Sequence, residues 1–236
     1  MEKACAPQVD TPSDPMRNVV AYFSMEIGLD VSIPTYSGGL GVLAGDTLRA
    51  AADLGAPVVA VTLVYHNGYV HQHLDENGHQ TETPFSWTPA DHLEPLDPRV
   101  TVRLQGRDVL VRAWRYVVKG QFGDPIPVIF LDTSLEENDP YDQTLTDHLY
   151  GGDNRYRLCQ ESILGIGGVK MLDALDMNST EVYHMNEGHS ALLTMELLRA
   201  VLAERGGRNA TDNDADAVRS KCVFTTHTPV PAGHDK

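Results

Sequence analysis

The chain has 236 residues, of which 42% are hydrophobic and 22% are charged, and its formal net charge is -15. This length fits one large α/β domain or two small ones, and the composition is that of an ordinary soluble globular protein. Such an acidic surface repels nucleic acids and anionic membranes, so both are excluded as partners. Any site for an anion must therefore be built locally, from backbone N–H groups or from a separate basic part.

The cysteines and the hydropathy pattern bear on the compartment. Cys5, Cys159 and Cys222 are few, odd in number and far apart. This argues against a disulfide framework and for a reducing compartment. The sequence shows neither a signal peptide nor an apolar run long enough to cross a bilayer. These observations predict a cytoplasmic protein.

The first part of the chain predicts one βαβ unit. Residues 1–17 are polar and rich in proline, and we expect a flexible leader. Residues 18–25 (NVVAYFSM) predict a strand, and a glycine-rich turn at 36–41 (YSGGLG) precedes a helix over 42–54. The almost wholly apolar residues 56–65 are typical of a parallel strand covered on both faces. The crossover between the two strands should be right-handed.

Helical spacing predicts the buried stripes of two helices. In the helix over 42–54 the expected buried residues are Leu43, Leu48, Ala51 and Leu54. A second, long helix is predicted over 153–175, where the stripe consists mostly of small residues that should pack closely: Leu158, Ser162, Gly165 and Val169.

The rest of the chain predicts further strands and helices. Residues 66–101 read as an elaborated loop with a hairpin around Gly68 and Gly78. The other predicted elements are two antiparallel strands at 100–107 and 108–118, a buried strand at 126–132, an acidic loop at 134–150, a strand at 181–184, a helix at 187–205, a mobile polar segment at 204–216 and a strand at 221–226. Because a helix normally follows such a last strand, we expect the front part of something larger.

The glycine turn is the first candidate for chemistry. Gly38, Gly39 and Gly41 leave the backbone free to take φ > 0 and let a ligand come close. The first N–H groups of the following helix have no partner within it and attract an anion, most often a phosphate. The spacing fits neither a Walker A loop nor a dinucleotide loop. A plain tight turn remains the alternative.

Three further polar turns could open onto the same rim. His227 comes just after a strand, Glu187 and His189 lie between a strand and a helix, and Asp153 and Asn154 open the long helix. In open α/β sheets, ligands gather at the carboxyl ends of the strands. Each turn also has a purely structural interpretation, as a satisfied strand-end histidine, as solvated first-turn residues or as helix caps.

Other motifs carry less. His71 and His73 alternate onto one strand face, but a third ligand is not evident, and no metal is predicted. The run at 165–168 (GIGG) lies inside a helical pattern without a preceding strand, which favours close helix packing over dinucleotide binding. No Ser-His-Asp grouping or GxSxG elbow is present.

Together these stretches resemble the amino-terminal domain of the α-glucan (glycogen and maltodextrin) phosphorylase family, in its shorter bacterial and archaeal form. The stretches that carry the resemblance are YFSME at 22–26, YSGGLGVLAGD at 36–46, LYGGD at 149–153, RLCQE at 157–161, NEGH at 186–189 and THTP at 226–229. They run in family order over about 19–231, and a set of this length is highly specific.

The resemblance implies a B-type glycosyltransferase fold, in which two Rossmann-like domains face each other across a cleft. This chain would be the amino-terminal half over 18–236, with an inserted antiparallel β region. The implied reaction is reversible phosphorolysis of α-1,4-glucans to glucose 1-phosphate with retention. Pyridoxal phosphate takes part through its phosphate group, but its lysine and the Arg and Lys that grip substrate phosphate belong to the second domain. We therefore expect no covalent cofactor on this chain and no activity of this polypeptide alone.

The resemblance also implies roles for single residues. His227 would be catalytic, holding the sugar through its backbone carbonyl near the anomeric carbon and turning its ring toward the 6-hydroxyl. Gly38, Gly39 and Gly41 would face the phosphates. The implied substrate-binding residues are Leu40 at the glucosyl site, Asp153 and Asn154 on the gating loop, Glu187 and His189 in the cleft wall, and Thr228.

The implied partners are an α-1,4-glucan with phosphate or glucose 1-phosphate, and the missing carboxyl-terminal domain or a second copy of the chain. Two other functions stay open. One is a non-catalytic glucan-binding fragment or split-enzyme partner. The other is a nucleotide-sugar glycosyltransferase of the glycogen synthase type, whose Lys-x-Gly-Gly loop is replaced here by Tyr36-Ser37. A glycosidase is least favoured, because no pair of carboxylates stands out.

Overall fold

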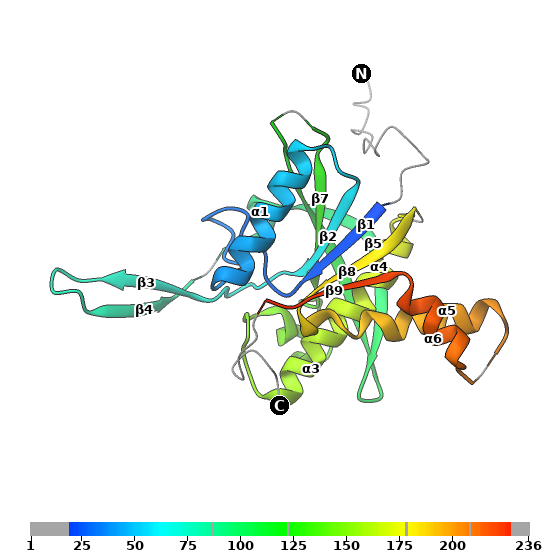
Figure 1. Ribbon diagram of the computed structural model, residues 1–236. Helices are drawn as coiled ribbons and strands as arrows, with labels where there is room; N and C mark the ends of the chain where they lie inside the picture. Colours follow the sequence, from blue (N-terminus) through cyan, green and yellow to red (C-terminus); the bar gives the residue numbers. More distant parts are fainter. Residues whose placement is uncertain (1–18, 86, 122, 178, 208, 228–236) are drawn as a thin grey trace, which may run out of the picture.

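The computed structural model describes residues 19–85, 87–121, 123–177, 179–207 and 209–227, so the predicted leader lies outside the described residues. Figure 1 shows a mixed α/β arrangement with one seven-stranded sheet and a separate two-stranded sheet. The strands are β1 (Val19–Ser24), β2 (Val58–Leu63), β3 (Val70–Leu74), β4 (Gln80–Pro84), β5 (Glu94–Leu104), β6 (Arg107–Val118), β7 (Ile126–Asp132), β8 (Thr180–Asn186) and β9 (Cys222–Thr225). The α-helices are α1 (Gly39–Asp53), α2 (Pro140–Gln143), α3 (Asn154–Ser162), α4 (Gly168–Ala174), α5 (Leu193–Glu204) and α6 (Asp212–Arg219).

The strand order of the large sheet is β5-β6-β7-β2-β1-β8-β9. The neighbours from β7 to β9 are parallel, as predicted for β1 and β2, whereas β5, β6 and β7 pair antiparallel. From β1 the chain first builds the sheet toward β2 and β7, and later returns to add β8 and β9 on the other side of β1. Such a switch between two neighbouring strands is where ligands bind in open α/β sheets, outside the carboxyl ends.

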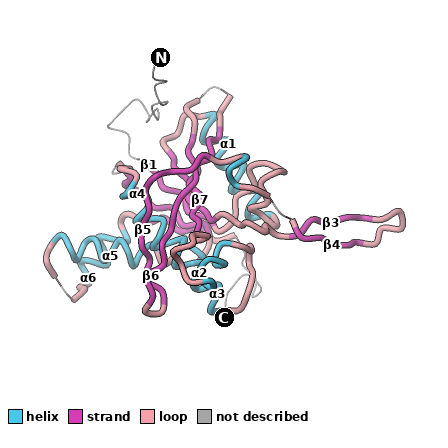
Figure 2. Tube along the Cα trace, turned by 180° about the vertical axis from the view of Figure 1, so that it is seen from behind, coloured by secondary structure: helices cyan, strands magenta, loops and turns pink. Residues whose placement is uncertain are grey.

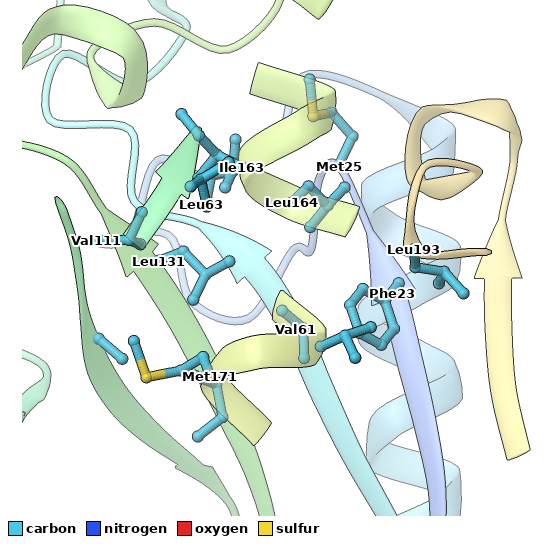
Figure 3. Packing of buried hydrophobic residues seen from close by; sticks show 14 of the residues in the cluster. Phe23, Met25, Val61, Leu63, Val111, Leu131, Ile163, Leu164, Met171 and Leu193 are labelled. Carbon is cyan, nitrogen blue, oxygen red and sulfur yellow. The ribbon is translucent and has the colours of Figure 1, made fainter. Parts of the chain in front are cut away.

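Helices cover both faces of this sheet because alternate residues of a strand point to opposite faces. Tyr22 of β1 belongs to a core cluster with Leu48 of α1. The next residue, Phe23, belongs to the cluster on the other face, with Ile163 and Leu164. Figure 3 shows this second cluster, in which side chains from β1, β2 and β7 meet the long helical segment.

The buried face of α1 differs from the predicted stripe. Leu48 is buried, but Leu43 is 41% exposed and Leu54 is 82% exposed. The face toward the sheet consists of Gly41, Ala44, Gly45, Leu48 and Ala52. Small residues are needed there, because a Cβ on Gly45 would overlap the carbonyl oxygen of Gly28. Spacing of large apolar residues alone therefore misplaced the face by part of a turn.

The long predicted helix is present as α3, a π-helical segment Ile163–Gly167 and α4 in direct succession. Its small residues pack closely, as predicted: a Cβ on Gly165 would come within 2.5 Å of the backbone nitrogen of Leu193. Leu158 is 56% exposed, so its place in the buried stripe was wrong. The π segment shifts the helix face by adding a residue to the turn, which a constant period of 3.6 cannot follow.

The hairpin predicted within 66–101 is present as β3 and β4, with Gly78 in its turn, and it projects away from the large sheet in both views (Figures 1 and 2). Two helical segments differ from their predictions. The predicted mobile segment at 204–216 contains most of α6, which begins with a capping box between Thr211 and Asp214. The helix at 187–205 begins later than predicted, because a 3₁₀ turn at Gly188–Ser190 precedes α5.

A buried carboxylate holds the carboxyl end of β7. Asp132 is 0% exposed and accepts hydrogen bonds from Arg112 at 2.7 Å, Trp114 at 2.9 Å and His66 at 3.0 Å. Burial by itself raises the pKa of Asp132, but the hydrogen bond and charge of His66, with Trp114 and Arg112, outweigh it and hold that pKa well below its usual value. The end of this one strand is closed by ion pairs.

No helix within the described ranges has both the length and the apolar character to span a bilayer.

Candidate functional site

A second buried carboxylate lies just after β1. Glu26 is 3% exposed, and its Oε2 accepts the N–H of Ser37 at 2.7 Å and the N–H of Gly38 at 3.3 Å. No described Lys, Arg or His forms an ion pair with it. The protein thus places its own anion against the glycine turn, a feature that the sequence did not predict.

The start of the glycine turn is open toward solvent, where Gly38 and Gly39 are exposed, whereas Gly41 is buried. Gly38 is the N-cap of α1 with φ -164, and α1 already begins at Gly39, three residues earlier than predicted. Neither Gly38 nor the helical Gly39 and Gly41 has positive φ, so the expectation that these glycines supply φ > 0 was wrong. Gly41 is required for close approach instead, because a Cβ there would lie 2.8 Å from Oε2 of Glu26.

Space remains in front of this turn. A Cβ on Gly38 or Gly39 would meet no atom within 4 Å. Among the described residues, no acceptor is hydrogen-bonded to the N–H groups of Gly39, Leu40 and Gly41, as expected for the first turn of a helix. The amide of Gly38 is bound to Glu26, and the three that follow point the positive end of α1 outward.

Tyr150 connects this turn to the predicted gating loop. Its hydroxyl donates to Oε1 of Glu26 at 2.8 Å, and its ring lies 5.7 Å from the ring of His189 and 5.4 Å from the guanidinium carbon of Arg157. Its backbone is in the left-handed region, at φ 55. His189 therefore lies beside the same tyrosine that contacts Glu26.

The two residues at the start of α3 are exposed. Asp153 is the N-cap, and its carboxylate accepts the N–H of Tyr156 at 2.9 Å. This is the structural interpretation that the sequence left open. Asn154 is the first residue of α3 and is also exposed. Both follow Tyr150 by only a few residues, so they stand on the rim of the same network.

A third carboxylate follows β8. Glu187 is 8% exposed and its carboxylate accepts the N–H of His227 and, at 3.3 Å, the hydroxyl of Thr226. Its backbone, at φ 67 and ψ 176, occupies a region that is almost restricted to glycine and costs about 1–3 kcal/mol for other residues. It therefore binds the neighbouring strand end from a strained position.

His227 is anchored twice. Besides the backbone contact to Glu187, its Nε2 lies 2.8 Å from Oδ1 of Asn186. Asn186 is 1% exposed and donates to Ser24 Oγ at 3.1 Å, and Ser24 in turn donates to the carbonyl oxygen of Glu26 at 2.7 Å. This series of hydrogen bonds leads from His227 to Glu26, and through its carboxylate to the glycine turn. Thr228 lies outside the described residues.

A neighbouring histidine faces the same strand pair. His184 lies 2.7 Å from Thr225 Oγ1 and meets the ring of Tyr22 edge to face at 5.0 Å. Burial, and then the charge of His227, lower the pKa of His184. This histidine is therefore neutral near pH 7 and belongs to the packing below the site.

The candidate site combines predicted and unpredicted residues. The predicted turns meet at the carboxyl ends of β1, β8 and β9. The residues that join them were not predicted to act: Ser24, Glu26, Tyr150 and Asn186. All four lie within stretches that carry the family resemblance, YFSME, LYGGD and NEGH, but no role was assigned to them from the sequence.

The fold is of the mixed α/β class, and its candidate site lies where the strand order of the parallel part of the sheet reverses, at the ends of β1 and β8. No protein-family model matches the chain. It is 42% identical to a glycogen phosphorylase of Mycobacterium tuberculosis over 227 residues, which are 92% of this chain and 26% of that protein. A maltodextrin phosphorylase of Thermococcus litoralis is 38% identical over 224 residues, again 92% of this chain and 26% of the relative.

A glycogen phosphorylase of Aquifex aeolicus is 31% identical over 225 residues, 92% of this chain and 31% of that protein. The chain is thus a homologue of the glycogen and maltodextrin phosphorylases over nearly all of its length. It spans about a quarter of the length of the first two relatives.

Proposed function

We propose that this chain forms one wall of the catalytic cleft of an α-1,4-glucan phosphorylase. The reaction would move a glucosyl unit from the end of a glucan to phosphate, giving glucose 1-phosphate, and run in reverse. The observation that carries the proposal is the hydrogen-bonded network that joins the glycine turn, the Tyr150 segment and His227 at one end of the sheet. The similarity to a glycogen phosphorylase and a maltodextrin phosphorylase supports the substrate class.

The phosphate would lie against the start of α1. The N–H groups of Gly39, Leu40 and Gly41 and the helix dipole favour a negative charge there. Gly38 would support this position indirectly, since its own N–H is bound to Glu26. Leu40, which is half-buried in the same turn, would lie at the glucosyl ring.

The sugar would be held by His227. Its ring and backbone are both fixed by buried partners, Asn186 and Glu187, so that it would meet a ligand without reorganising. We assign Glu187 to positioning His227 rather than to lining the cleft. Asp153, Asn154, His189 and Thr228 remain proposed contacts on the rim of the site.

Pyridoxal phosphate fits this chain in part. When bound, it supplies a second phosphate group beside the substrate phosphate, and the amides at the start of α1 suit such a group. The described lysines do not suit its aldehyde: Lys170 donates to the carbonyl of Thr101 at 2.9 Å, Lys119 lines a groove with Leu29 and Arg49, and Lys221 precedes β9 at the opposite end of that strand. We therefore assign the cofactor lysine and the phosphate-binding cations to the part of the relatives that this chain does not match.

The test is a complementation assay. The chain is combined with the remainder of the Mycobacterium tuberculosis relative, maltoheptaose, phosphate and pyridoxal phosphate, and glucose 1-phosphate is measured. We expect product from the pair, none from the chain alone, and none when the chain carries His227→Ala. His79→Ala in the exposed hairpin turn is the control and should keep the activity.

Product from the chain alone would show that the second half is dispensable. Glucan binding without product in the pair would favour the alternative of a non-catalytic glucan-binding fragment. Neither binding nor product would contradict the proposal.

A further inference from the structure

Glu26 and Tyr150 lie where two separate loops meet. The first loop is the glycine turn at the start of α1, and the second is the segment 149–154 that leads into α3. One carboxylate binds both: Oε2 takes the N–H groups of Ser37 and Gly38, and Oε1 takes the hydroxyl of Tyr150. We propose that the pair Glu26–Tyr150 is a positioning device that makes these two loops move as one unit.

The contact has the strength that such a device needs. A buried carboxylate that accepts three hydrogen bonds forms stronger bonds than a neutral acceptor would. A buried donor that loses its hydrogen-bond acceptor costs free energy. Moving one loop away from Glu26 while the other loop stays in place is therefore unfavourable. Gly41 has no Cβ, which lets the carboxylate approach the turn to the distance observed.

The position of Tyr150 is also fixed by its own loop, the segment 149–154, and by the side chains around it. Its backbone is in the left-handed region at φ 55, where a bulky residue is held only by its surroundings. Its ring lies between His189 and Arg157 at 5.7 Å and 5.4 Å. The hydroxyl therefore cannot follow Glu26 without moving the segment that carries it.

The consequence concerns ligand binding, and in this respect it rests on the proposed function. An anion that settles on the amides of Gly39 to Gly41 would stabilise the turn, and through Glu26 and Tyr150 it would stabilise the segment with Asp153 and Asn154. A ligand on that segment would stabilise the turn by the same amount, because coupling between two sites is reciprocal.

Amide hydrogen exchange of the chain, without sugar or phosphate, tests the coupling itself. In Tyr150→Phe we expect faster exchange in the segment 149–154 and also, by about tenfold, at Ser37 and Gly38, whose N–H groups are bound to Glu26. Glu26→Gln should speed exchange in both loops. In the double variant the effects should be less than additive, because both changes break one device.

Two controls separate coupling from general destabilisation. Asp30→Asn removes a carboxylate of the same β1–α1 connection that accepts hydrogen bonds from the N–H and hydroxyl of Ser32, at 2.9 Å and 2.7 Å, and should leave both loops unchanged. The amides of Val61 and Ile129 in the central strands report global unfolding and should be equal in all variants. If Tyr150→Phe leaves Ser37 and Gly38 within about twofold of the parent, the coupling is overturned. That failure would leave the proposed function standing, since no substrate is present, whereas the complementation assay can fail while the coupling holds.

Discussion

Two places along the carboxyl edge of the same sheet, the end of β7 and the ends of β1 and β8, are each held by buried carboxylates, but they are built differently. At the end of β7, Asp132 is paired with Arg112 and His66 on an ordinary backbone. After β1 and β8, Glu26 and Glu187 accept hydrogen bonds from backbone N–H and hydroxyl groups, next to the exposed Gly38, Gly39 and His227. Strained residues, Tyr150 and Glu187, occur only at the second place.

This difference indicates that the carboxylate at the end of β7 serves stability, whereas the carboxylates after β1 and β8 hold loops beside a place where a ligand can bind. A buried carboxylate paired with cationic side chains stabilises its surroundings, because its charge is neutralised within the protein. A carboxylate that binds amides and hydroxyls fixes loops in place while the dipole of α1 stays available to an external anion. Backbone strain persists where the surroundings impose it, and such places cluster at functional sites.

The largest effect is expected at the closed end. Asp132→Asn leaves Arg112 and His66 without their buried partner and should lower the free energy of unfolding by about 3 kcal/mol in urea denaturation. The matched control is Asp46→Asn, whose partner Arg49 lies 3.1 Å away on the surface, and it should cost less than about 0.5 kcal/mol. Equal effects of the two substitutions would mean that the buried pairing of Asp132 stabilises the protein no more than an exposed ion pair does.

The middle and the start of helix α1 give a second contrast. Gly45→Ala should cost about 2 kcal/mol, because the new Cβ overlaps the carbonyl oxygen of Gly28 and the helix must shift. Gly39→Ala, in open space, should change stability by less than about 0.5 kcal/mol. Thermal denaturation of both variants measures this. A large loss in Gly39→Ala would mean that the turn is packed rather than open.

Strain at Glu187 can be measured with a pair of truncations. Glu187→Ala and Glu187→Gly both remove the carboxylate that binds His227, but only glycine tolerates φ 67 with ψ 176. The glycine variant should therefore be more stable than the alanine variant by about 1 kcal/mol. The same comparison at Glu181, an exposed residue of β8, should favour alanine. An alanine preference at both positions would contradict the strain.

The smallest effect concerns pH. The pKa of His184 is lowered in the folded protein, first by burial and then by the charge of His227. Below the ordinary pKa of about 6.5 the unfolded chain binds a proton that the folded chain does not, so stability falls as the pH falls through this value. His184→Gln should flatten the curve of unfolding free energy against pH in that range. An unchanged curve would mean that His184 is not the responsible group.

The sequence predicted the strands and the long helices of this fold because their apolar runs are long and periodic. β7 has the predicted bounds, and β1, β2 and α1 lie within a few residues of theirs. The sequence-based prediction was wrong where the helix departs from a period of 3.6 residues or where a helix contains few apolar residues. The π-helical segment before α4 shifts the buried face, and α6 is too polar to be recognised except by its capping box.

The candidate site was predicted as a set of turns but not as a structure. Their convergence follows from the strand order, in which β1 and β8 become neighbours although most of the described chain separates them. Glu26 and Asn186 could not be recognised as the joining residues, because their partners are backbone amides and distant side chains that leave no local pattern. The phosphorylase resemblance supplied what spacing alone could not, and the relatives support it.

The most direct test of the central claim is a titration of the isotope-labelled chain with maltoheptaose and inorganic phosphate, followed by NMR. The claim predicts that phosphate shifts the amide signals of Gly39 to Gly41 and that the oligosaccharide shifts the ring signals of His227. Shifts that occur instead on the β3–β4 hairpin or around Tyr141, with Gly39 to Gly41 and His227 unchanged, would contradict it.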